Sequence, residues 1–73
     1  LNEILYTLKE GEKNAFQIAS LISWDVNYKS WELFPAAQKW FAVGETLAHL
    51  EYLEEQGMVR RELKEDRILF SLA

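Results

Sequence analysis

The sequence contains no cysteine, one proline, three glycines and one histidine in 73 residues. Without cysteine, disulfides, thiolate catalysis and zinc ribbons are excluded. The low glycine and proline content excludes collagen-like and low-complexity chains, and no apolar run approaches the roughly 18 residues that cross a bilayer. Hydrophobic residues make up 49% of the chain and charged residues 27%, which is the composition of a folded domain. We therefore expect a single domain over residues 1–73, with no membrane partner.

The start of the chain indicates a domain cut from a longer protein. Leu1, Ile4, Leu5 and Leu8 have helical spacing from the first residue, so the helix is expected to continue upstream. The alternative is a processed N-terminus, with Asn2 as the N-cap and Leu1 as a hydrophobic staple. No signal-peptide pattern is visible, and we expect a cytoplasmic location.

Capping residues and periodicity predict three helices followed by a hairpin. The first helix covers 1–10 and ends at Gly11, and the second covers 14–22 with an Asn14–Gln17 capping box. Residues 23–34 have no clean period and form a long connection, in which one helical turn is an option. The third helix covers 35–56, with Pro35 in first position and Gly57 at its end. Strands at 58–63 and 68–72 enclose a turn at 64–67, so the class is α+β and the fold a winged helix.

The third helix is apolar on two sides. Its core face is expected to be Val43, Thr46, Leu47, Leu50 and Leu53. A second stripe lies roughly opposite by the 100° step of an α-helix, and consists of Ala37, Phe41, Gly44, Ala48 and Tyr52. Gly44 costs about 1 kcal/mol against alanine in mid-helix, and close approach of another element is a reason to tolerate it.

Aromatic residues are concentrated beside this stripe, since six of the ten, including all three tryptophans, lie within 24–41. In one interpretation the connection folds back over the stripe and closes the domain. In the other, the stripe docks on a partner together with Trp24 and Trp31, because exposed apolar patches mark interfaces. Self-association through the same stripe is a third possibility.

Charge argues against nucleic acid as the partner. The net charge is −4, and residues 45–57 hold four acids and no base. Duplex binding depends on cations that neutralise phosphates, yet Lys39 is the only lysine or arginine of the third helix. The nucleic-acid alternative rests on Lys39 with the four hairpin cations Arg60, Arg61, Lys64 and Arg67. Acids interleave with those cations, which favours cross-strand ion pairs instead.

No catalytic or metal site is expected within the chain, and no cofactor. His49 is the only histidine, and Glu45 four residues earlier explains it as a helical Glu–His pair. One histidine with carboxylates falls short of the usual zinc ligand sets. No glycine-rich loop could hold a phosphate, and no serine or threonine pairs with a base at a motif spacing.

Residues 34–53, read as FPAAQKWFAVGETLAHLEYL, resemble the winged-helix domain at the C-terminus of many metallo-β-lactamase-fold hydrolases. The most specific part is ETLAHLEYL at 45–53, with Gly57-Met58-Val59 after it, and the segment 14–19 is similar to the family's second helix. The Trp-rich connection at 23–34 is not matched to the family in detail.

The resemblance implies a parent protein with an N-terminal αββα hydrolase domain and a two-metal His/Asp site, holding ions such as zinc. The present chain would then be a C-terminal accessory domain that packs on this catalytic domain and borders its substrate entrance. Such parents include hydrolases of small esters and thioesters, and some nucleases. The nucleic-acid-binding alternative is a winged helix of a regulator or of such a nuclease.

Overall fold

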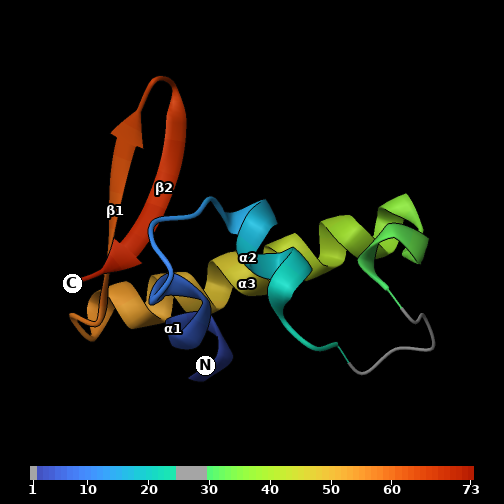
Figure 1. Cartoon of the computed structure of the whole chain (residues 1–73), viewed down its shortest axis with the longest axis horizontal. Helices are drawn as coiled ribbons and strands as arrows, with labels where there is room; N and C mark the ends of the chain where they lie inside the picture. Colours follow the sequence, from blue (N-terminus) through green and yellow to red (C-terminus); the bar gives the residue numbers. More distant parts are fainter. Residues whose placement is uncertain (1, 25–29) are drawn as a thin grey trace.

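The computed structural model describes residues 2–24 and 30–73, and their elements follow the expected α+β order (Figure 1). The elements are α1 (Asn2–Leu8), α2 (Ala15–Leu21), the 3₁₀ turn η1 (Trp31–Leu33), α3 (Ala36–Glu55), β1 (Val59–Lys64) and β2 (Arg67–Leu72). Three α-helices followed by an antiparallel hairpin form a winged-helix-like arrangement, so the predicted fold class is confirmed. Within the described part of the 23–34 connection, η1 is the helical turn considered above.

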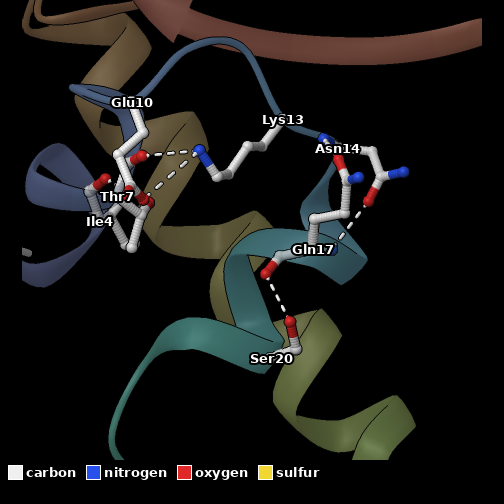
Figure 2. A network of polar contacts seen from close by, with 7 residues as sticks. All are labelled: Ile4, Thr7, Glu10, Lys13, Asn14, Gln17 and Ser20. Carbon is white, nitrogen blue, oxygen red and sulfur yellow. Dashed lines mark hydrogen bonds and ion pairs between the residues drawn. The ribbon is translucent and has the colours of Figure 1, made fainter.

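Local backbone chemistry sets the helix ends. The Asn14 side chain accepts a hydrogen bond from the Gln17 N–H, and the Gln17 side chain accepts one from the Asn14 N–H, which completes the predicted capping box (Figure 2). Gly11 and Gly57 have φ of 132° and 76°, a region that glycine reaches without steric cost. Pro35 is the N-cap of α3 rather than its first helical residue, so the predicted start is one residue early.

The first helix is shorter than predicted and ends at Leu8 instead of Glu10. The N–H groups of Lys9 and Glu10 bond to carbonyls three residues back, so the chain tightens into turns there. Lys13 reaches back to this end, since its Nζ donates to the Thr7 carbonyl at 2.9 Å and lies 3.9 Å from Glu10 Oε1 (Figure 2). A lysine that bonds a terminal carbonyl complements the negative end of a helix.

The hairpin is longer than predicted because its turn contains only two residues. Lys64 pairs with Arg67, and Glu65 and Asp66 between them have φ of 50° and 65°. Positive φ at both central residues matches the right-handed twist of the flanking strands. On its other side β2 pairs with Lys13, which exchanges two backbone hydrogen bonds with Phe70 at 3.0 and 2.8 Å. The base of the wing is thereby attached to the connection between α1 and α2.

The core joins the three α-helices to the inner end of the hairpin. Its buried cluster consists of Ile4, Leu8, Ile18, Leu50, Leu53, Val59 and Phe70. The hydroxyls of the buried Thr7 and Thr46 donate to the carbonyls of Ile4 and Ala42 in their own helices, at 2.8 and 2.9 Å, so burial leaves neither donor unpaired.

The predicted core face of α3 is partly wrong. The buried residues of α3 are Ala42, Thr46, Leu50 and Leu53, while Val43 is half-buried and Leu47 is 42% exposed. The buried positions are separated by four, four and three residues, so the true face is rotated away from Leu47. Among the described residues, no helix combines the length and apolar character needed to cross a membrane.

Candidate docking surface

The side of α3 that faces away from the core is exposed and largely apolar. All five residues of the predicted second stripe are exposed, with Phe41 at 64% and Tyr52 at 50%. Trp40, at 72%, and Leu47 lie beside the stripe by the 100° helical step and extend it. We call this surface the outer face of α3; it consists of Ala37, Trp40, Phe41, Gly44, Leu47, Ala48 and Tyr52.

Trp40 and Leu47 were absent from the predicted docking residues. Leu47 was assigned to the core because it continues the i, i+3, i+4 pattern of Val43 and Leu50. The angular position on the helix could have placed both residues, since Trp40 falls between the two predicted faces and Leu47 lies at the edge of the predicted core face nearest the stripe. A helix with apolar residues over so much of its circumference cannot bury all of them against one small core.

Gly44 lies in the middle of the outer face. A Cβ added there would meet nothing within 4 Å, so none of the described residues approaches this glycine closely. The described part of the 23–34 connection therefore does not supply the close approach proposed to explain Gly44. The space above Gly44 is open to a second surface.

Trp24 and Trp31 are positioned differently from the stripe, because both are half-buried against their own chain. The indole Nε1 of Trp24 donates to the Ala19 carbonyl at 2.8 Å. Trp31 makes an edge contact with Phe16 at 5.4 Å and a tilted contact with Phe34 at 5.0 Å, measured between ring centroids. The predicted docking set thus separates into an exposed group on α3 and two tryptophans packed near α2 and η1. Residues 25–29 of the aromatic window lie outside the described residues.

Three of the four hairpin cations have carboxylate partners. Arg61 Nη2 donates to Glu54 Oε1 at 2.6 Å, and its Nε donates to both carboxylate oxygens at 3.0 and 3.1 Å. This hydrogen bonding raises the pKa of the Arg61 guanidinium. Lys64 Nζ lies 3.1 Å from both Glu12 oxygens, and the hydrogen bond to Glu12 raises the pKa of that lysine.

The prediction that the hairpin cations pair with acids of the opposite strand is wrong. Arg60 approaches Glu62 of its own strand at 3.6 Å, while the partners of Arg61 and Lys64 lie outside the hairpin. The alternation of charges along the hairpin could not reveal these partners, because they come from α3 and from the loop after α1. Arg67 has no ion pair within the described residues. Lys39 places its Nζ 5.9 Å from the centroid of the Trp31 ring.

Over residues 2–24 and 30–73, no group of three or more histidine, aspartate or glutamate side chains is arranged to hold a metal ion. His49 is exposed on α3. Among the predicted sites, the exposed apolar face of α3, with acids beside it, is the one that the described residues present to solvent.

Comparison with known families gives one match. Residues 32–71, more than half of the chain, match the family model described as "Metallo-beta-lactamase-like, C-terminal domain". The match confirms the resemblance drawn from residues 34–53. No curated protein and no solved structure matches the chain.

Proposed function

This chain belongs to the metallo-beta-lactamase-like C-terminal domain family, and from that premise we propose that it is an accessory domain that packs on an N-terminal hydrolase domain of the same protein. The outer face of α3 is the surface that docks. The domain performs no catalysis itself. Its role is to order the neighbouring catalytic domain and to border the entrance of the active site. A cytoplasmic location is part of this proposal.

The single observation that carries the proposal is the exposure of the outer face of α3. Trp40 and Phe41 are adjacent large apolar residues, and most of each is open to solvent, at 72% and 64% exposure. Soluble monomers rarely expose contiguous apolar patches larger than a few hundred Å², and such large patches mark interaction sites. Tryptophan and other aromatic residues are also enriched in the cores of protein interfaces.

The hydrolase chemistry is assigned to the N-terminal domain. Metal ions such as zinc, bound there as a pair, would supply a Lewis acid and an activated water. The described residues of this chain do not fit a metal ion, so no step of the reaction is assigned to them. Their contribution is an apolar surface that excludes water where the two domains meet.

Nucleic-acid binding is the weaker candidate. In a helix-turn-helix domain the recognition helix places its exposed side chains against bases and phosphates. Here the exposed side of that helix carries Trp40, Phe41 and acids, and three hairpin cations already contact carboxylates. Docking on a protein surface uses the residues that are present, whereas phosphate binding would require cations that are absent from this face of α3.

The test uses the full-length protein that contains both domains. Replacing Trp40 and Phe41 with glutamine should separate the domains while leaving both folded, which small-angle X-ray scattering reads as a larger radius of gyration. Tyr6→Gln is the matched control, since Tyr6 is 71% exposed but lies on α1. An unchanged radius in the double variant would contradict the docking role of this face.

Self-association of the chain is distinguished from docking on the N-terminal domain by the molar mass in solution. If the same face pairs two copies of the chain, the molar mass in sedimentation experiments will rise with concentration, and the Trp40 and Phe41 substitutions will abolish that rise. Docking within one protein predicts a molar mass that does not rise with concentration, because the partner surface belongs to the same protein.

A further inference from the structure

The outer face of α3 changes character along the helix. Its residues from Ala37 to Ala48 are apolar, whereas beyond Ala48 the exposed residues Glu51 and Glu55 lie beside Tyr52. By the 100° helical step, Glu55 lies at the same angular position on α3 as Ala37, and Glu45 lies at the edge of the stripe next to Phe41. The surface is therefore an apolar patch with acids along one side and at one end.

Most of this negative charge is not balanced within the described residues. Glu54 is held by Arg61, and Glu51 attracts the same guanidinium more weakly. Glu45 and Glu55 are exposed and form no ion pair in the described part of the chain. Two carboxylates that border the apolar patch thus point into water in the isolated domain.

The position of Glu55 is unfavourable for the helix itself. A helix C-terminus carries a partial negative charge, which favours lysine and arginine in the last turn. The last turn of α3 has no basic residue and contains Glu54 and Glu55. Glu54 is paired with Arg61, whereas Glu55 forms no ion pair within the described residues.

We propose that the outer face of α3 recognises a cationic, apolar surface on the N-terminal domain, with lysine or arginine side chains opposite Glu45 and Glu55. This inference rests on the proposed docking function and specifies the chemistry of the partner. Apolar contacts to Trp40, Phe41 and Leu47 supply affinity, and the acidic border supplies orientation, because charges at an interface rim steer and select partners.

The acids of α3 also argue against two other binding partners for its outer face, an anionic lipid surface and a second copy of the chain. Anionic lipid would repel the acids at the end of the patch. In a symmetric dimer through this face, parallel α3 helices would oppose acids to acids, and antiparallel helices would oppose the apolar half of one copy to the acidic half of the other. A basic, apolar protein surface avoids both conflicts.

The test measures docking through a thiol introduced by Ala48→Cys in the full-length protein. The rate of reaction with a thiol reagent, read by mass spectrometry of the peptide that spans position 48, reports the undocked fraction. In that background, Glu45→Gln with Glu55→Gln removes the unpaired acids and leaves the Arg61 contacts intact. The control is Glu65→Gln with Asp66→Asn, which makes the same change of net charge at the exposed hairpin turn.

We expect the Glu45/Glu55 variant to react between about twofold and thirtyfold faster than the Ala48→Cys protein at low salt, as two rim ion pairs of about 0.2–1 kcal/mol each imply. The control variant should react at the unchanged rate, and 1 M salt should remove the difference by screening. If the thiol at position 48 reacts slowly whether or not Glu45, Glu55 and salt are changed, the proposal of a cationic partner surface is overturned, while the docking proposal stands. No protection at all, relative to the 73-residue chain, would overturn docking itself.

Discussion

Phe41→Gln tests whether the outer face of α3 belongs to the core or to a surface. Phe41 is 64% exposed, so about a third of its surface is removed from water. Full burial of a phenylalanine side chain contributes about 1.5–3 kcal/mol, which gives an expected loss of about 0.5–1 kcal/mol for Phe41→Gln. Glutamine is a good helix former, so the helix propensity term is small.

Leu50→Ala is the matched comparison on the opposite side of the same helix. Leu50 is fully buried in the core cluster, and truncation of a buried leucine costs about 2–5 kcal/mol. Both variants are measured by urea unfolding of the 73-residue chain followed by far-ultraviolet circular dichroism. The expected order is a small shift of the midpoint for Phe41→Gln and a large one for Leu50→Ala, with an unchanged slope for both.

A loss of 2 kcal/mol or more for Phe41→Gln would refute this reasoning. It would mean that the side chain is held in a core, in agreement with the alternative in which the aromatic connection covers the stripe. The docking proposal would then lose the exposed surface on which it depends.

Three further predictions follow from the same geometry. Gly44→Ala should stabilise the isolated chain by about 0.5–1 kcal/mol in urea unfolding, because the added methyl group meets nothing within 4 Å; a loss of stability would show that the space is occupied. A double-mutant cycle with Arg61→Ala and Glu54→Ala should give a coupling energy of about 0.5–1 kcal/mol that shrinks in 1 M salt, because both groups are partly exposed; zero coupling at low salt would show that the contact does not stabilise the wing. A fluorescently labelled duplex DNA or RNA at 0.15 M salt should show no binding tighter than about 10⁻⁶ M, and salt-dependent binding tighter than this would favour the nucleic-acid alternative.

The sequence predicts best those features that depend on neighbouring residues. The Asn14–Gln17 capping box is a hydrogen-bond exchange across three residues, and both of its bonds are present. Gly11 and Gly57 have the positive φ that their positions after helices suggest. The ends of the hairpin turn are harder to predict from the sequence, since Glu65 and Asp66 adopt positive φ although neither is glycine. Each strand therefore extends by one residue into the predicted turn.

Features that depend on the whole fold were less predictable. The sequence of α3 contains two apolar faces, and helical spacing predicts Leu47 on the core face although it is 42% exposed. Thr46 is a confirmed exception, since the sequence predicts it on the core face and it is fully buried, its hydroxyl bonded to the Ala42 carbonyl. The partners of Arg61 and Lys64 depend on where α3 and the loop after α1 lie relative to the hairpin, which charge spacing does not encode.

Docking of the outer face of α3 on the N-terminal domain of the same protein is the proposal on which the others depend. The most direct measurement is the thiol reaction rate of Ala48→Cys in the 73-residue chain compared with the full-length protein, under the same conditions. We expect fast reaction in the isolated chain, where Ala48 is exposed, and reaction slower by about tenfold or more in the full-length protein, which corresponds to docking worth about 1.4 kcal/mol or more. Equal rates in the two proteins would contradict the claim.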